Sequence, residues 1–163
     1  MFSAEHELST EHEPRTAPSE NTAGLADAEA LVARAEADET AAHDARQRFR
    51  DDPMAPVAPD EAIAPHLVPG EELFAIRSSA IINGPGVAAP LTGYGGTLYL
   101  TSQRIVHLGQ VTLSLRLEDI EELSLAGERL LLTLRSGDGI ALDVDGPRLL
   151  RAQIAAAMAA LRP

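Results

Sequence analysis

Two histidines near the N-terminus lie among carboxylates and are the first candidates for a metal site. The sequence Glu5-His-Glu7 is repeated as Glu11-His-Glu13. Two imidazoles with flanking carboxylates could hold zinc or nickel, but such a site would have to order a polar segment and would have no second shell to support it. We therefore interpret the repeat as a solvated acidic tail and predict no metal site.

The remaining polar residues do not form the pattern of a catalytic site. His66 and His107 have no serine, cysteine or aspartate at a spacing typical of a triad or a metal cluster, and the chain contains no cysteine. The glycine-rich sequence from Gly93 to Gly96 is not followed by a helix, so it cannot form a phosphate cradle. We predict a protein that is not an enzyme and has no cofactor, and we interpret His107 as a structural histidine.

The charge of the chain argues against polyanionic partners. The formal net charge is -12, and the basic residues, all arginine, show no segregated patch. A protein of this kind is repelled by nucleic acids and by anionic lipid surfaces. The lack of cysteine suits a reducing compartment, so we expect a cytoplasmic protein.

The composition of the chain divides it into four segments. Residues 1–22 are predicted to be a disordered acidic tail, and residues 23–50 a helix rich in alanine, glutamate and arginine with a weak apolar stripe. Prolines recur through residues 51–66, which predicts a stiff linker. Residues 67–163 are predicted to form the folded domain.

From residue 71 onward the hydrophobic period becomes two, which indicates half-buried antiparallel strands. Seven strands are predicted, at residues 71–83, 97–101, 104–108, 111–117, 120–125, 130–135 and 140–145. After Asp145-Gly-Pro147 the period changes to that of an amphipathic helix. The expected fold is mainly β: a seven-stranded antiparallel barrel with one end covered by a C-terminal α-helix.

Three short motifs resemble the pleckstrin-homology-like (PH-like) and GRAM-like domains of bacteria. The chain as a whole resembles an actinobacterial protein of this kind. Leu67-Val-Pro-Gly-Glu-Glu-Leu73 looks like the entry to their first strand. Gly96-Thr-Leu-Tyr-Leu-Thr-Ser-Gln-Arg-Ile-Val106 is similar to their second hairpin, in which a threonine ends one strand and an arginine begins the next, as Thr101 and Arg104 do here. Leu115-Arg-Leu-Glu-Asp-Ile120 resembles the exit of their fourth strand. The resemblance implies a PH-like barrel and a binding function.

The first-hairpin loop, residues 83–96, is the predicted contact surface. Relatives that hold inositol phosphates carry several basic residues there, whereas this loop has no charged residue. We expect a non-enzymatic module that binds a protein partner, or alternatively one that associates weakly with the inner face of the membrane through the same apolar loop. The candidate binding residues are Val87, Leu91, Tyr94, Arg77 and Arg104. Arg104 has two interpretations: it holds its hairpin in register, or it joins Arg77 or Arg116 in an anion site.

Overall fold

A computed structural model describes residues 20–84 and 93–162 of the chain. The predicted acidic tail therefore lies almost wholly outside the described residues. The chain divides into two units, residues 1–32 and 33–163. The described part of the first unit is the beginning of helix α1 (Glu20–Asp51), where Leu25, Leu31 and Val32 are exposed.

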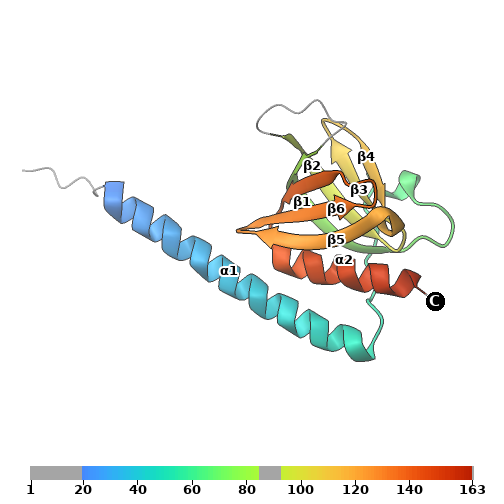
Figure 1. Cartoon of the computed structure of the whole chain (residues 1–163), viewed down its shortest axis with the longest axis horizontal. Helices are drawn as coiled ribbons and strands as arrows, with labels where there is room; N and C mark the ends of the chain where they lie inside the picture. The colour runs from blue at the N-terminus through green and yellow to red at the C-terminus, as the bar shows by residue number, and fades with distance from the viewer. Residues whose placement is uncertain (1–19, 85–92, 163) are drawn as a thin grey trace, which may run out of the picture. The chain divides into compact units, whose positions relative to one another are not determined.

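The second unit is built on one seven-stranded antiparallel sheet, in the order β4-β3-β2-β1-β7-β6-β5. Figure 1 draws this sheet with the C-terminal helix beside it. Its strands are β1 (Leu73–Asn83), β2 (Tyr94–Thr101), β3 (Arg104–Gly109), β4 (Leu113–Arg116), β5 (Ile120–Ala126), β6 (Arg129–Leu134) and β7 (Gly139–Asp143). The predicted mainly-β fold with seven antiparallel strands is confirmed. Within the described chain, β4 and β5 are the two edge strands and do not pair with each other, so the sheet is not closed.

Strand β2 begins three residues earlier than the sequence predicts. The sequence predicts Gly95 and Gly96 as part of the loop of residues 83–96, because glycines are typical of turns. The structure pairs Gly96 with Gly109 of β3, and a β-carbon on Gly96 would lie 2.4 Å from the Leu108 carbonyl oxygen. The two strands approach so closely here that only glycine fits, which a propensity argument cannot detect.

Helix α2 (Pro147–Leu161) packs on the sheet and completes its main core. It contacts β1, β5, β6 and the short 3₁₀ turn η2 (Leu117–Asp119), and it buries Leu150, Ile154 and Ala157. These side chains join the inward-facing residues of the strands in a single hydrophobic cluster. The predicted C-terminal amphipathic helix is confirmed.

A second, smaller core lies elsewhere on β1, β2 and β3. Leu73, Tyr99 and Val106 pack there with Ile63, which is fully buried and comes from the segment predicted to be a linker. Asp60 fixes this segment: its carboxylate accepts hydrogen bonds from the backbone N–H groups of Ala62 and Ile63, at 3.0 and 2.9 Å, and from the Tyr99 hydroxyl at 2.8 Å. A 3₁₀ turn, η1 (Ala64–His66), follows.

The second half of α1 also contributes buried side chains to the folded unit. The apolar stripe of this helix is mostly alanine, which predicts little buried area, yet Ala42 and Ala45 are fully buried. Asp38 supplies a specific contact. Its carboxylate accepts hydrogen bonds from the backbone N–H groups of Arg148 and Leu149, at 2.8 and 3.0 Å. Asp38 thus caps the N-terminus of α2, whose own N-cap residue, Gly146, has no side chain to do so.

A β-bulge interrupts strand β1, which pairs with β2 along most of its length and with β7 at its end. Residues Leu73 to Arg77 pair with β2, and the register shifts between Arg77 and Ala80. Beyond the shift, Ala80 to Ile82 pair with β2, and Ile81 to Asn83 pair with β7. Ser79, inside the shift, has a left-handed φ of 58°. The displaced Ala80 carbonyl oxygen lies 3.2 Å from Nε2 of the buried His107, whose Nδ1 lies 3.3 Å from the Val111 carbonyl oxygen. His107 therefore has the structural contacts that its isolation in the sequence suggested.

None of the helices in the described ranges, residues 20–84 and 93–162, is both long enough and apolar enough to cross a membrane.

Candidate functional site

The predicted contact loop is described only at its two ends. Val87 and Leu91 lie outside the described residues. Tyr94, the first residue of β2, pairs with Ile82 and is half-buried against the main core. The adjoining backbone is fixed by Gln110, whose side-chain oxygen accepts a hydrogen bond from the Gly95 N–H at 2.9 Å, while its own N–H donates to the Gly95 carbonyl. The loop therefore emerges from a firmly held hairpin, and Tyr94 belongs partly to that hairpin's packing.

Arg77 lies among the residues that join β1 to the start of α2. Its guanidinium donates to the Asp145 carbonyl at 3.0 Å and to the Gln153 side-chain oxygen at 3.1 Å. Burial lowers the pKa of Arg77, and the charges of Asp38 and Asp145 oppose that effect. These contacts use Arg77 as an internal tie between elements.

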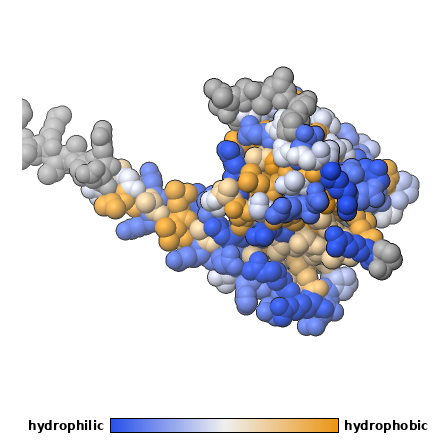
Figure 2. Space-filling model, viewed as in Figure 1, coloured by the Kyte–Doolittle hydropathy of each residue, from blue (hydrophilic) through white to orange (hydrophobic). Residues whose placement is uncertain are grey.

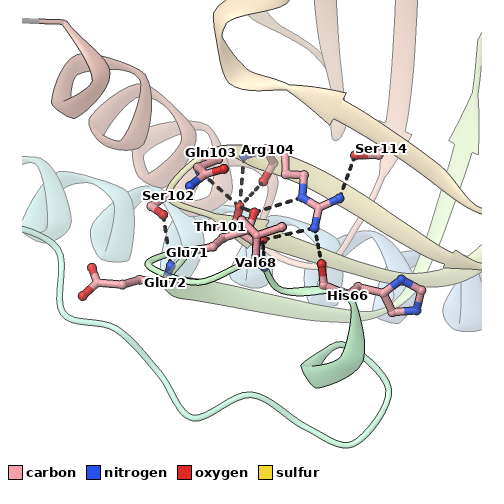
Figure 3. Close-up of polar contacts among 9 residues, drawn as sticks. All are labelled: His66, Val68, Glu71, Glu72, Thr101, Ser102, Gln103, Arg104 and Ser114. Carbon is pink, nitrogen blue, oxygen red and sulfur yellow. Dashed lines mark hydrogen bonds and ion pairs between the residues drawn. The ribbon is translucent and has the colours of Figure 1, made fainter.

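Arg104 is the centre of a polar cluster at the turn between β2 and β3 (Figure 3). Its Nε and Nη2 donate to the two carboxylate oxygens of Glu71, at 2.9 and 3.1 Å, and Nη2 also donates to the His66 carbonyl. Nη1 donates to the Ser114 hydroxyl at 3.2 Å. Arg104 thus holds together β3, β4 and the chain that enters β1, which is the structural interpretation given above.

Thr101 shapes the turn itself. Its hydroxyl accepts hydrogen bonds from the backbone N–H groups of Gln103 and Arg104, at 3.1 and 3.0 Å, and donates to Glu71 at 2.9 Å. Glu71, Thr101 and Arg104 stand in two of the three motifs quoted in the sequence analysis, and the fold brings all three into direct contact (Figure 3).

The electrostatics of this cluster favour an ionised Glu71. Burial by itself raises the pKa of the Glu71 carboxyl, but hydrogen bonds from Arg104, Thr101 and the Val68 N–H outweigh it, so the pKa lies below the ordinary value. The same pairing raises the pKa of Arg104. Both groups are therefore charged at neutral pH, and the positive charge of Arg104 offsets the negative charge of Glu71.

Arg104 lies opposite Arg116 in the sheet. Arg77 and Arg104 form their hydrogen bonds with different partners. Arg104 and Arg116 are register partners on β3 and β4, and both line a pocket of about 430 Å³. Each is already paired with a carboxylate, Arg104 with Glu71 and Arg116 with Glu118. The positive charge available to an anion in this pocket is therefore small.

A larger groove, which the sequence analysis did not find, opens at the C-terminal ends of the two helices. Its volume is about 600 Å³, and its apolar lining includes Phe49 at the end of α1, Met54, Phe74 on β1, and Ala157 and Leu161 on α2. In Figure 2 a pale-orange, apolar area lies where Figure 1 draws α2. The chain has only three phenylalanines, and two of them line this groove.

One signal in the sequence pointed toward this groove. Phe49 is a large apolar residue within a charged stretch, Arg46 to Asp52, and Phe74 follows the acidic pair Glu71-Glu72 and Leu73. Their meeting depends on where α1 ends relative to β1, and this is a tertiary contact that periodicity does not encode.

Within the described residues, no three histidine, aspartate or glutamate side chains come close enough to hold a metal ion. His6 and His12 lie outside the described part of the chain.

Comparisons with known proteins give little further information. No family model matches the chain, and no curated protein matches it. Among solved structures it is similar to the C-terminal domain of an unknown protein from Leishmania infantum, with 19% sequence identity and a TM-score of 0.40, over 56% of this chain and 84% of that one.

Proposed function

We propose that this protein is a non-enzymatic PH-like binding module that recognises a segment of a partner protein. The observation that carries the proposal is the open apolar groove, in which Phe49, Met54 and Phe74 face the last turn of α2. Concave apolar surfaces with a polar edge are typical of sites that accept an apolar group of a partner. Aromatic residues are only 3% of the chain, so their concentration at one open surface is notable.

Two features support the PH-like part of this proposal. Seven antiparallel strands are followed by one C-terminal helix, which is the element order that the family resemblance implies. The motif residues Glu71, Thr101 and Arg104 form one hydrogen-bonded unit. In this proposal β4 and β5 are the edges at which the barrel remains open.

The proposal leaves two surfaces for the partner, the groove and the loop of residues 83–96. Affinity capture from the source cell with the full chain as bait, followed by mass spectrometry, should recover a protein partner. Two variants separate the surfaces. Ala160→Tyr places a large ring on an exposed position of the groove wall. Val87→Ser with Leu91→Ser removes the valine and the leucine of the loop. Loss of the partner with either variant, at an unchanged Tm, supports a protein-binding function.

A partner that both variants retain, or the absence of any protein recovered above an unrelated bait, would contradict the proposal.

Sedimentation with anionic vesicles tests the membrane alternative. Because the net charge is -12, we expect no vesicle binding that strengthens as salt is lowered. Salt-sensitive vesicle binding that the loop variant abolishes would instead favour association with a membrane.

A further inference from the structure

The rim of the groove is acidic. Asp51, Asp52 and Glu72 all line it, and within the described part of the chain none of their carboxylates has an ion-pair partner. Arg50 is the one arginine in the lining, and its Nη1 lies 3.5 Å from the Gln47 side-chain oxygen on its own helix. The rim therefore presents three uncompensated negative charges beside one positive charge.

The helix ends add to this negative potential. Helix α1 ends at Asp51 and α2 ends at Leu161, and both residues line the groove. The C-terminus of a helix carries a partial negative charge and carbonyl groups without intrahelical partners. Asp51 and Asp52 stand at the end of α1, where the macrodipole disfavours carboxylates. Arg48 and Arg50, in the last turn of α1, partly offset these carboxylates, and a cation from a partner would add to that effect.

We infer that the groove binds a short amphipathic segment of a partner protein, with an apolar side chain inserted between Phe49, Phe74 and α2 and with Lys or Arg beside it on the rim. This inference rests on the proposed function and names the chemistry of the partner. The occupant is selected by charge: an acidic peptide, an anionic membrane or a second copy of this chain, whose net charge is also -12, would bring like charges onto the rim.

The inference is tested with a defined probe and the full chain. The probe is a fluorescent amphipathic peptide of about four helical turns made of leucine and lysine, and its matched control has glutamate in place of lysine. Fluorescence anisotropy at low and at physiological salt should show saturable binding of the leucine–lysine peptide, weakened by salt, and no binding of the leucine–glutamate peptide.

Groove variants with matched controls locate that binding. Ala160→Tyr should weaken it at least about tenfold, because the ring occupies the place of the apolar anchor. Ala155→Tyr, at an exposed position of the same helix outside the lining, should leave it unchanged. Asp52→Asn with Glu72→Gln should also weaken binding and reduce its salt dependence, whereas Glu121→Gln with Glu122→Gln, on exposed positions of β5, should do neither.

If Ala160→Tyr lowers the Tm, the variant with Asp52→Asn and Glu72→Gln still tests the groove. The inference is overturned if the leucine–glutamate peptide binds as tightly as the leucine–lysine peptide, if no saturable binding occurs, or if every groove variant binds like the wild type. Its failure is distinct from that of the proposed function, because a partner captured from the cell and lost only with the loop variant would preserve a protein-binding role while excluding the groove.

Discussion

At the scale of single residues, Glu71 is the acceptor on which the β2–β3 turn depends. Its pKa in the folded chain lies below the ordinary value of 4.5. The stability that this carboxylate contributes is therefore present above about pH 4.5 and is lost as the pH falls through the lower folded pKa. Glu71→Gln should lower the free energy of unfolding at neutral pH by about 1–3 kcal/mol.

The pH dependence of that loss is the sharper measurement. Thermal melts of wild type and Glu71→Gln should differ most at neutral pH and converge in acid, because protonation removes the advantage of the native carboxylate. Glu72→Gln, at the exposed neighbouring position, should show no such convergence. A Glu71→Gln variant whose Tm stayed parallel to the wild type at all pH values would mean that Arg104 is held by its other acceptors.

Ser79 is the second residue with a measurable local effect. Its φ of 58° is a conformation that costs an L-residue about 1–2 kcal/mol and costs glycine almost nothing. Ser79→Gly should therefore be neutral or stabilising in chemical denaturation. Ser78→Gly, at the adjacent exposed position without a positive φ, should be destabilising by about 0.5–1 kcal/mol. Equal losses from both changes would contradict the role assigned to the bulge.

At the scale of elements, the cap of α2 comes from another helix. Asp38→Ala removes the acceptor for two N–H groups and should destabilise the protein by about 1–2 kcal/mol. Asp38→Asn keeps one oxygen and should lose less. Asp44→Ala, at an exposed position of the same helix, is the control and should stay close to wild type in urea unfolding. If Asp38→Ala unfolds at the wild-type midpoint, water replaces the cap without cost.

The strands could be predicted from sequence because alternation of apolar and polar residues reports directly which face of a sheet is buried. Leu130, Leu132 and Leu142 show this pattern and are buried. The cap could not be predicted, since Asp38 looks like any surface carboxylate of a charged helix. The early start of β2 was missed for a related reason: the fit of Gly96 against Gly109 exists only once the strands are paired.

At the scale of the whole molecule, the effect of shortening the chain on stability should depend on where the shortened chain begins. A chain of residues 33–163 keeps Asp38, Ala42 and Ala45 and should melt like the full chain. A chain of residues 53–163 loses the cap of α2 and two buried alanines, and it should be less stable by at least about 2 kcal/mol. Calorimetry on both chains checks this. Equal melting of the two would show that the part of α1 from residue 33 onward does not stabilise the fold.

In the candidate sites too, the sequence identifies residues of local motifs but not contacts between distant segments. Arg104 and Thr101 could be identified from their motif, and the contacts of Arg104 agree with its structural interpretation. The groove required the distant segments around residues 49, 74 and 160 to meet. Val87 and Leu91 lie outside the described residues, so their role as contact residues stays a prediction.

The hydrogen bond from the Arg148 N–H to Asp38 also has a consequence for the order in which the protein folds. The two residues are 110 positions apart. During synthesis Asp38 emerges long before its partner, and chains are made at about 5–20 residues per second. A nascent chain can therefore form α1 and pair its early strands, but it cannot complete this closure until α2 has left the ribosome. We expect the protein to reach its full protection against proteolysis only after synthesis of α2, in one late step.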